Sequence, residues 1–192
     1  MEAEPLFRLI AITPPAPVAD EAAKIAALLD AGWWRVHLRH PGTDDATLEE
    51  IISRLPAEVR GRISIHDSFG LAVKYGIGGV HLNRRTPAAP EGWPRTVSRS
   101  CHSVGEALMC AGMDYITLSP VFDSISKPGY TGVEFGALPS GVTVIGLGGV
   151  TPERAAQLKA RGFAGAAMLG AIPWQATVSE ITGFATKTLE IC

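Results

Sequence analysis

Short apolar runs alternate along the chain with segments whose apolar residues recur at helical spacing. The apolar runs predict eight strands, at residues 6–13, 33–39, 62–65, 79–82, 96–100, 115–118, 142–147 and 165–169. The segments between them predict helices at residues 20–31, 44–55, 69–75, 107–111, 152–159 and 179–189. Strands and helices that alternate in this way are typical of a parallel sheet.

Eight such strands favour a closed (β/α)8 TIM barrel. The chain has 192 residues, fewer than the roughly 250 that are typical of this fold, so its loops must be short. An open, doubly wound sheet is the alternative. Residues 1–192 contain no repeat, linker or low-complexity segment, and we therefore expect a single domain.

The composition narrows the class of protein. The chain is 46% hydrophobic and 19% charged, as in ordinary globular proteins, and its net charge of −2 attracts neither nucleic acid nor an anionic membrane. Three cysteines, Cys101, Cys110 and Cys192, show no paired spacing, which favours a reducing compartment. We expect a cytoplasmic protein without nucleic-acid or membrane partners. A homodimer stays open, because the sequence does not separate apolar surface positions from core positions.

Helix signals stand at three of the predicted boundaries. Asp44 and Asp45 open one helix with the negative charge that a helix N-terminus favours. Ser103 and Glu106 have the spacing of a capping box. Thr151 precedes Pro152, the residue type preferred at the first helical position.

Polar side chains gather where the predicted strands end, which in parallel α/β proteins is where ligands bind. Packing alone explains such a set poorly. In chain order the set comprises His37, Arg39, His66, Asp67, Asn83, Arg84, Arg85, Ser100, His102, the segment 119–127, Gly148, Gly149 and Gly170.

The stretch 114–132 begins as a predicted buried strand and continues as a polar loop. Ser119, Ser124 and Ser126 supply hydroxyls, and Lys127 supplies an ammonium group. This combination suits an anionic ligand such as a phosphate or pyrophosphate. A polar surface loop that binds nothing is the alternative.

Glycines follow the last two predicted strands. Gly148 and Gly149 lie between a strand and a helix, and Gly170 follows the eighth strand. Glycine lets backbone N–H groups approach a phosphate, and the corresponding loops of TIM barrels often bind one. A tight turn that requires positive φ is the alternative.

Other charged and imidazole groups have two interpretations each. His37 and Arg39 share one face of a strand, so Arg39 is a phosphate ligand or a salt-bridged rim residue. Asp67 is a Mg²⁺ ligand or the cap of the following helix. His66, His81 and His102 lack helical metal-site spacing, so we predict no zinc site, and His81 is a core residue or faces the helices.

Several motifs together resemble the thiamine phosphate synthase/TenI family. In chain order they are VHLR, IHDS, GVHLN, SRSCHS, AGMDYITLSPVFDSISK, GLGGVTPE and GAAMLGAI, spread over residues 10–172. The resemblance implies a (β/α)8 barrel that joins a hydroxymethylpyrimidine pyrophosphate to a thiazole phosphate and releases pyrophosphate. It also implies Mg²⁺ as cofactor and the thiazole nitrogen as nucleophile.

The resemblance implies roles for most of the candidate residues. It implies that Arg39, Ser100 and Lys127 make the catalytic contacts with the pyrophosphate, and that Asp67 binds the metal. It implies that Gly148, Gly149 and Gly170 bind the phosphate of the thiazole. It also implies substrate binding by His37 in place of a usual Gln, His66 in place of a usual Asn, Ser124 and Ser126. His102, Arg84 and Arg85 are further substrate-binding candidates because of their place at the strand ends.

Departures from the family pattern lie around the pyrophosphate. Pro41 stands where the family pattern has a Lys, and Thr86 stands where it has a second metal-binding Asp. We expect Arg84 or Arg85 to replace part of the lost charge, and only one of them to face the mouth, since neighbouring strand residues point opposite ways. Ser119 and Pro120 stand where tautomerases of the TenI branch have a His, so His37 or His102 would have to serve as base. A relative that binds phosphate ligands without synthase activity is the alternative.

Overall fold

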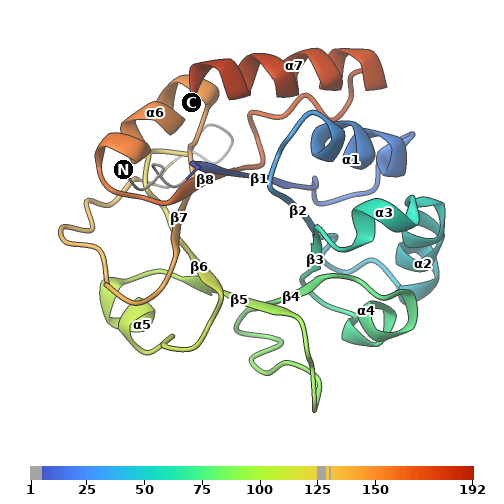
Figure 1. The fold of residues 1–192 in the computed structure, drawn as a ribbon, viewed down its shortest axis with the longest axis horizontal. Helices are drawn as coiled ribbons and strands as arrows, with labels where there is room; N and C mark the ends of the chain where they lie inside the picture. The colour runs from blue at the N-terminus through green and yellow to red at the C-terminus, as the bar shows by residue number, and fades with distance from the viewer. Residues whose placement is uncertain (1–5, 125–128, 130) are drawn as a thin grey trace.

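The computed structural model describes residues 6–124, 129 and 131–192. Its strands form a closed, all-parallel barrel in the order of the sequence (Figure 1). This confirms the predicted (β/α)8 TIM barrel and excludes the open doubly wound sheet. The strands are β1 (Arg8–Ile12), β2 (Arg35–Leu38), β3 (Ile63–Ile65), β4 (Gly79–Leu82), β5 (Thr96–Cys101), β6 (Tyr115–Leu118), β7 (Val144–Leu147) and β8 (Gly165–Met168).

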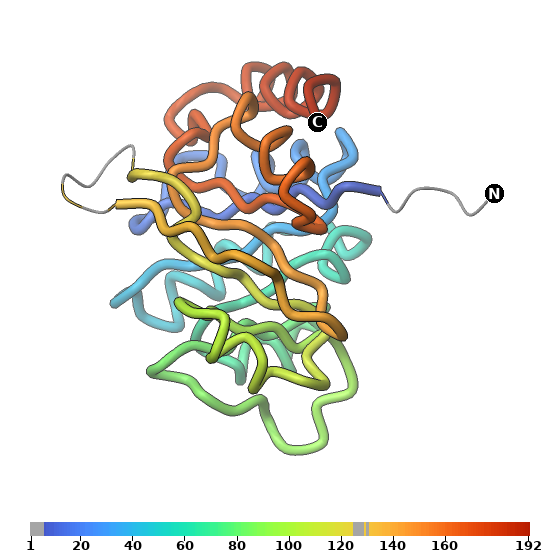
Figure 2. The backbone as a smooth tube through the Cα atoms, turned by 90° about the vertical axis from the view of Figure 1, so that its left-hand side faces the viewer, coloured from blue at the N-terminus to red at the C-terminus, as the bar shows by residue number. Residues whose placement is uncertain are grey.

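Helices surround the barrel, with α1 packed against α7 and the long 83–95 loop at the opposite side (Figures 1 and 2). No helix joins β4 to β5, and none of the described residues between β6 and β7 is helical. The helices are α1 (Glu21–Asp30), α2 (Asp45–Arg54), α3 (Ala57–Arg60), α4 (Phe69–Tyr75), α5 (Val104–Leu108), α6 (Pro152–Ala160) and α7 (Val178–Ile191).

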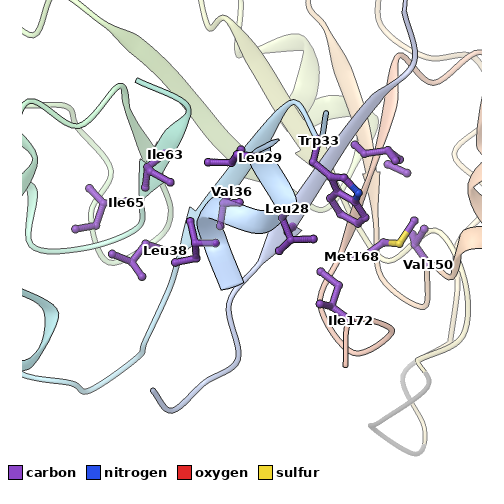
Figure 3. Close-up of a cluster of buried hydrophobic side chains, with 14 of the residues drawn as sticks. Leu28, Leu29, Trp33, Val36, Leu38, Ile63, Ile65, Val150, Met168 and Ile172 are labelled. Carbon is purple, nitrogen blue, oxygen red and sulfur yellow. The ribbon is translucent and has the colours of Figure 1, made fainter. Parts of the chain in front are cut away.

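The main hydrophobic core lies between the barrel and its helices. Side chains alternate between the two faces of a strand, and Val36 of β2 and Ile63 of β3 lie on the outward face. They pack with Leu28 and Leu29 of α1 and with Trp33, all of them fully buried (Figure 3). Gly32 ends the α1 turn with a φ of 114°, which explains the glycine there.

The barrel interior is divided into an apolar and a polar sector. Inward positions of β7, β8 and β1 carry apolar side chains, among them Ile145, Ala167 and Ile10. Inward positions from β2 to β6 carry buried polar side chains instead. That polar set comprises Arg35, His37, Ser64, His81, Ser98 and Thr117.

Helix boundaries differ from the predictions at a few places. Helix α3 was not predicted, and α5 begins before the predicted residue 107. Ser103 caps α5, since its hydroxyl accepts a hydrogen bond from the Glu106 amide. The reciprocal bond of a capping box is absent from this described segment, because the Glu106 carboxylate accepts from the His102 amide.

Asp67 does not cap α4. The N-cap is Ser68, in a left-handed conformation with φ of 53° and without a side-chain capping bond. The Asp67 carboxylate instead accepts a hydrogen bond from the guanidinium of Arg85. The helix-cap alternative for Asp67 is therefore wrong, and this carboxylate faces the loop that follows β4.

Candidate functional site

A cavity of 910 Å³ opens at the carboxyl ends of the strands. Much of its lining comes from strand ends and from the residues that follow them, as expected for a TIM barrel. Twelve of the polar and glycine residues predicted from the sequence to form a site line it together: Arg39, His66, Asn83, Arg84, Arg85, Ser100, His102, Ser119, Ser124, Gly148, Gly149 and Gly170. Ser126 and Lys127 lie outside the described residues.

One side of the cavity is cationic. Arg39 follows β2 and is half-buried, with its backbone amide held by the hydroxyl of Thr13. Burial and the nearby Arg85 lower the pKa of Arg39, while Asp67 opposes them. Like charges held close together in this way are stabilised by an anion, so this side of the cavity suits a polyanionic ligand.

Arg84 and Arg85 both line the cavity, contrary to the expectation that only one faces the mouth. Strand β4 ends at Leu82, so the alternation of side chains along a strand does not extend to these two residues. Arg85 forms an ion pair with Asp67 at 3.1 Å. No ion pair between described residues involves Arg84.

The surroundings of Asp67 do not fit a dedicated Mg²⁺ site. One carboxylate oxygen accepts from Arg85, and the other lies 3.5 Å from the Thr86 hydroxyl. The nearby Asn83 side-chain oxygen already accepts from two backbone amides. Mg²⁺ requires near-octahedral oxygen ligands, and the described residues here offer one carboxylate that is already paired with a cation.

The opposite side of the cavity is made of glycine backbone. Gly148 and Gly149 have φ of 98° and 63°, which disfavour any side chain. A Cβ on Gly149 would lie 2.2 Å from the carbonyl oxygen of Asp123, and one on Gly148 would lie 2.8 Å from Cα of Pro120. The glycines therefore satisfy a tight turn and a close approach of two loops, and they also line the cavity with backbone atoms.

Two hydroxyl–imidazole pairs lie between these sides. The Ser100 hydroxyl lies 2.9 Å from Nε2 of His81. His102 places Nδ1 3.2 Å from the Ser119 hydroxyl and 3.3 Å from its carbonyl oxygen. His102 thus lies beside Ser119, which stands where the resemblance implies a His in tautomerases of the TenI branch.

Beneath the cavity, His37, His66 and His81 form a cluster that we call the histidine triad. One ring nitrogen from each lies within 4.8 Å of one from each of the others, and all three residues are buried. Nδ1 of His37 lies 2.8 Å from Nε2 of His66. His81 thus faces the barrel interior, not the helices.

Each imidazole of the histidine triad is held neutral. Burial lowers the pKa of His37 well below its usual value, with the charges of His81 and Arg35 acting in the same direction. Burial, His81 and His37 lower the pKa of His66 likewise. Burial and Arg39 lower the pKa of His81 to about 3.

The sequence-based prediction missed the histidine triad because it searched for helical spacing. The signal that finds it is strand alternation across neighbours. His37 and His81 occupy inward positions of β2 and β4, and His66 directly follows β3. Parallel pairing of β2 with β3 and of β3 with β4 brings these three positions together.

A buried hydrogen-bond network continues below the histidine triad. Tyr115 Oη lies 2.6 Å from Nε2 of His37 and 3.2 Å from the Ser64 hydroxyl. Arg35 donates to Ser64 and to the Thr96 hydroxyl. Many polar groups of this sector are therefore satisfied by one another, as is usual for buried polar groups. Nε of Arg35 and the Thr117 hydroxyl are exceptions, since neither has a hydrogen-bond partner among the described residues.

None of the helices in the described part of the chain is long and apolar enough to cross a membrane.

Comparison with known proteins points to one family. The family model described as thiamine monophosphate synthase matches residues 9–172. A Geobacter sulfurreducens protein whose name proposes a thiamine-phosphate synthase is 31% identical over 169 residues, covering 80% of this chain and 79% of that protein. The thiamine-phosphate synthase of Yersinia pestis is 27% identical over 192 residues, covering 86% of each.

A solved structure agrees with these sequence matches. The crystal structure of thiamine phosphate pyrophosphorylase from Bacteroides thetaiotaomicron superposes with a TM-score of 0.79. The two chains are 26% identical, and the alignment covers 96% of this chain and 97% of that one. The sequence matches and the structural match thus agree, which confirms the resemblance carried by the sequence motifs.

Proposed function

Because the chain belongs to the thiamine monophosphate synthase family, we propose that it joins a hydroxymethylpyrimidine pyrophosphate to a thiazole phosphate and releases pyrophosphate. The observation that carries this proposal is the two-sided cavity, with arginines on one side and glycine backbone on the other. Two ligands, one with a pyrophosphate and one with a single phosphate, match these two sides. A site for one anion would need only one of them.

The reaction breaks the bond between the methylene carbon of the pyrimidine and the pyrophosphate oxygen, and the electron pair leaves with pyrophosphate. The thiazole nitrogen then forms a new bond to that carbon. Charge that develops on the leaving group needs fixed positive partners. The described arginines that line the cavity on the β2–β5 side are Arg39, Arg84, Arg85 and Arg99. We assign this role to Arg39, Arg84 and Arg85, which follow the ends of β2 and β4. Lys127 is assigned to the same role from the sequence motif alone.

We assign the remaining residues of the cavity to binding and orienting the two substrates. We assign the pyrimidine ring to His66, with His37 behind it, because imidazole nitrogens donate or accept hydrogen bonds as the amides of the family pattern would. Ser100 is held by His81 and points its hydroxyl into the cavity. Backbone amides of Gly148, Gly149 and Gly170 are assigned to the thiazole phosphate, with Ser124 beside them.

The ion pair between Asp67 and Arg85 competes with metal binding at Asp67. In this chain the guanidinium of Arg85 is paired with the carboxylate that binds Mg²⁺ in the family pattern. We therefore route no step through a resident magnesium ion at Asp67. Neutralisation of the pyrophosphate falls to the arginines.

The test is a synthase assay with purified protein and both substrates, read by mass spectrometry. We expect thiamine phosphate together with an equal amount of pyrophosphate, and loss of both products in Arg39→Ala. If the protein binds the thiazole phosphate but forms no thiamine phosphate under any metal condition, the proposal is wrong. The chain would then be a phosphate-binding relative that lacks synthase activity.

A further inference from the structure

We propose that the histidine triad, His37, His66 and His81, binds a divalent transition-metal ion of the zinc class inside the barrel. The site lies beneath the cavity and is distinct from the Asp67 position. The inference does not depend on the proposed function, because it requires no substrate and no turnover. Among the described residues, these three form the one cluster of at least three potential metal-binding side chains.

The three nitrogens converge from separate strands. His37 lies on β2, His66 directly after β3 and His81 on β4, and the three ring nitrogens all lie within 4.8 Å of one another. Ligand nitrogens in a tetrahedral zinc site with bonds of about 2.0–2.1 Å lie about 3.3 Å apart. The separation of 2.8 Å between His37 and His66 must therefore widen slightly, while His81 moves closer.

The outer nitrogens of His37 and His81 are already held in the manner of metal-binding histidines. A ligating imidazole usually donates its other N–H to a fixed oxygen, which sets the ring orientation. Nε2 of His37 lies 2.6 Å from Tyr115 Oη. Nδ1 of His81 lies 2.7 Å from the Ser98 hydroxyl. Because that hydroxyl lies 3.4 Å from the Val80 carbonyl and donates to it, His81 Nδ1 is the donor and its Nε2 keeps a lone pair.

The fourth ligand position opens toward the cavity. His66 lines the cavity, whereas His37 is fully buried behind it. Ser100, which now bonds Nε2 of His81, would exchange this bond for one to the ligand in the fourth position. Three protein nitrogens with one open position are the ligand pattern of reactive zinc sites.

The ligand set selects the metal. It contains neither carboxylate nor thiolate, and imidazole suits Zn²⁺, Cu²⁺ and Ni²⁺ better than Mg²⁺. Metal ligation requires neutral imidazole, which is the state that burial enforces here. The charge of Arg39 acts against a cation, since it lowers the pKa of His81 and of His66. Removal of that charge should tighten metal binding.

The competing account is that the triad is only a hydrogen-bonded network that binds no metal. The test uses protein purified without a polyhistidine tag, stripped with a chelator and titrated with Co²⁺ and Zn²⁺. We expect one equivalent of Co²⁺ to give the visible bands of a tetrahedral site, and Zn²⁺ to displace it. His37→Gln, His66→Gln and His81→Gln should each weaken binding by at least about a hundredfold.

His102→Gln is the matched control, because His102 lines the cavity outside the triad. It should bind metal like the parent protein, and Arg39→Gln should bind it more tightly. Anomalous scattering at the zinc edge from crystals of the unmodified protein gives an answer that does not depend on whether a variant folds. Metal that is absent from the triad in those crystals, or binding that survives all three triad substitutions, would overturn the proposal.

Discussion

The two sectors of the barrel interior are both filled by buried side chains, but these are apolar in one sector and polar in the other. From β7 through β8 to β1, inward positions such as Ile145 and Ile10 fill the space with apolar side chains. From β2 to β6, the interior holds Arg35, three imidazoles and several hydroxyls, all buried. A barrel needs only volume in its interior, and TIM barrels usually supply it with Val, Ile and Leu.

Packing accounts for the apolar sector, whereas the polar sector indicates a functional role. Buried polar groups cost free energy unless every one finds a partner, so a polar sector is retained only where it serves something besides packing. The cationic side of the cavity stands above this polar sector, and the glycine side stands above β7 and β8. We infer that side-chain chemistry is concentrated on one side and backbone chemistry on the other.

The largest expected effect is on the pH dependence of stability. The triad histidines have folded pKa values below the about 6.5 of an unfolded chain. The unfolded state therefore binds more protons below that pH, so the contribution of these histidines to stability is fully present above it and is lost as the pH falls. For His81 the loss runs from about pH 6.5 to about pH 3, at about 1.4 kcal/mol per pH unit. His37 and His66 add to the slope in the same direction. Urea unfolding of chelator-treated protein between these pH values measures the slope.

A matched pair separates the two sectors in that experiment. His81→Gln should reduce the slope by about one proton. Ile145→Val, in the apolar sector, should lower stability by about 0.5–1.5 kcal/mol and leave the slope unchanged. Equal slopes for His81→Gln and the parent protein would show that the polar sector does not titrate as described.

The second effect concerns the glycine side. Gly149→Ala combines a left-handed φ of 63° with a Cβ placed 2.2 Å from the Asp123 carbonyl oxygen. We expect it to lower the free energy of unfolding by about 2–5 kcal/mol. Gly42→Ala is the control, because its φ of 82° is similar and its added Cβ meets nothing within 4 Å. Thermal unfolding of both variants compares them, and equal losses would mean that the close approach at Gly149 contributes nothing.

The third effect concerns anion binding at the cationic side. Arg39→Ala should weaken pyrophosphate binding by about 1.5–3 kcal/mol, the usual worth of a hydrogen bond to a charged group. Arg54→Ala removes an exposed arginine on α2 and should leave the affinity unchanged. Isothermal titration calorimetry with pyrophosphate decides. If both variants bind as the parent does, Arg39 is a rim residue and not a ligand.

The smallest effect separates the two neighbouring arginines. Arg85 is 60% exposed and already paired with Asp67, so its loss should cost about 0.5–1 kcal/mol of pyrophosphate affinity. Arg84→Ala should cost more than Arg85→Ala. Because Arg85 is the partner of Asp67, Arg85→Ala should also make pyrophosphate binding respond more strongly to Mg²⁺, and calorimetry with and without the metal tests this. The opposite ranking would assign the main anion contact to Arg85.

Much of this arrangement could be predicted from the sequence. The eight strands follow from short apolar runs, and the cavity follows from polar residues such as Arg39 and Ser100 at their ends. The four-residue helix α3 was missed, because its sequence is too short to show a helical period. The partner of Asp67 and the triad were also missed, since both depend on contacts between the ends of neighbouring strands, which a search for helical spacing within one segment does not find.

We propose that the cationic side of the cavity binds the pyrophosphate and that the glycine side binds the single phosphate. A crystal structure with pyrophosphate and a thiazole phosphate bound together would decide between this and the alternatives. We expect pyrophosphate against Arg39 and Arg84, and the thiazole phosphate against the backbone of Gly149 and Gly170. Both ligands on one side, or the two sides exchanged, would refute this assignment.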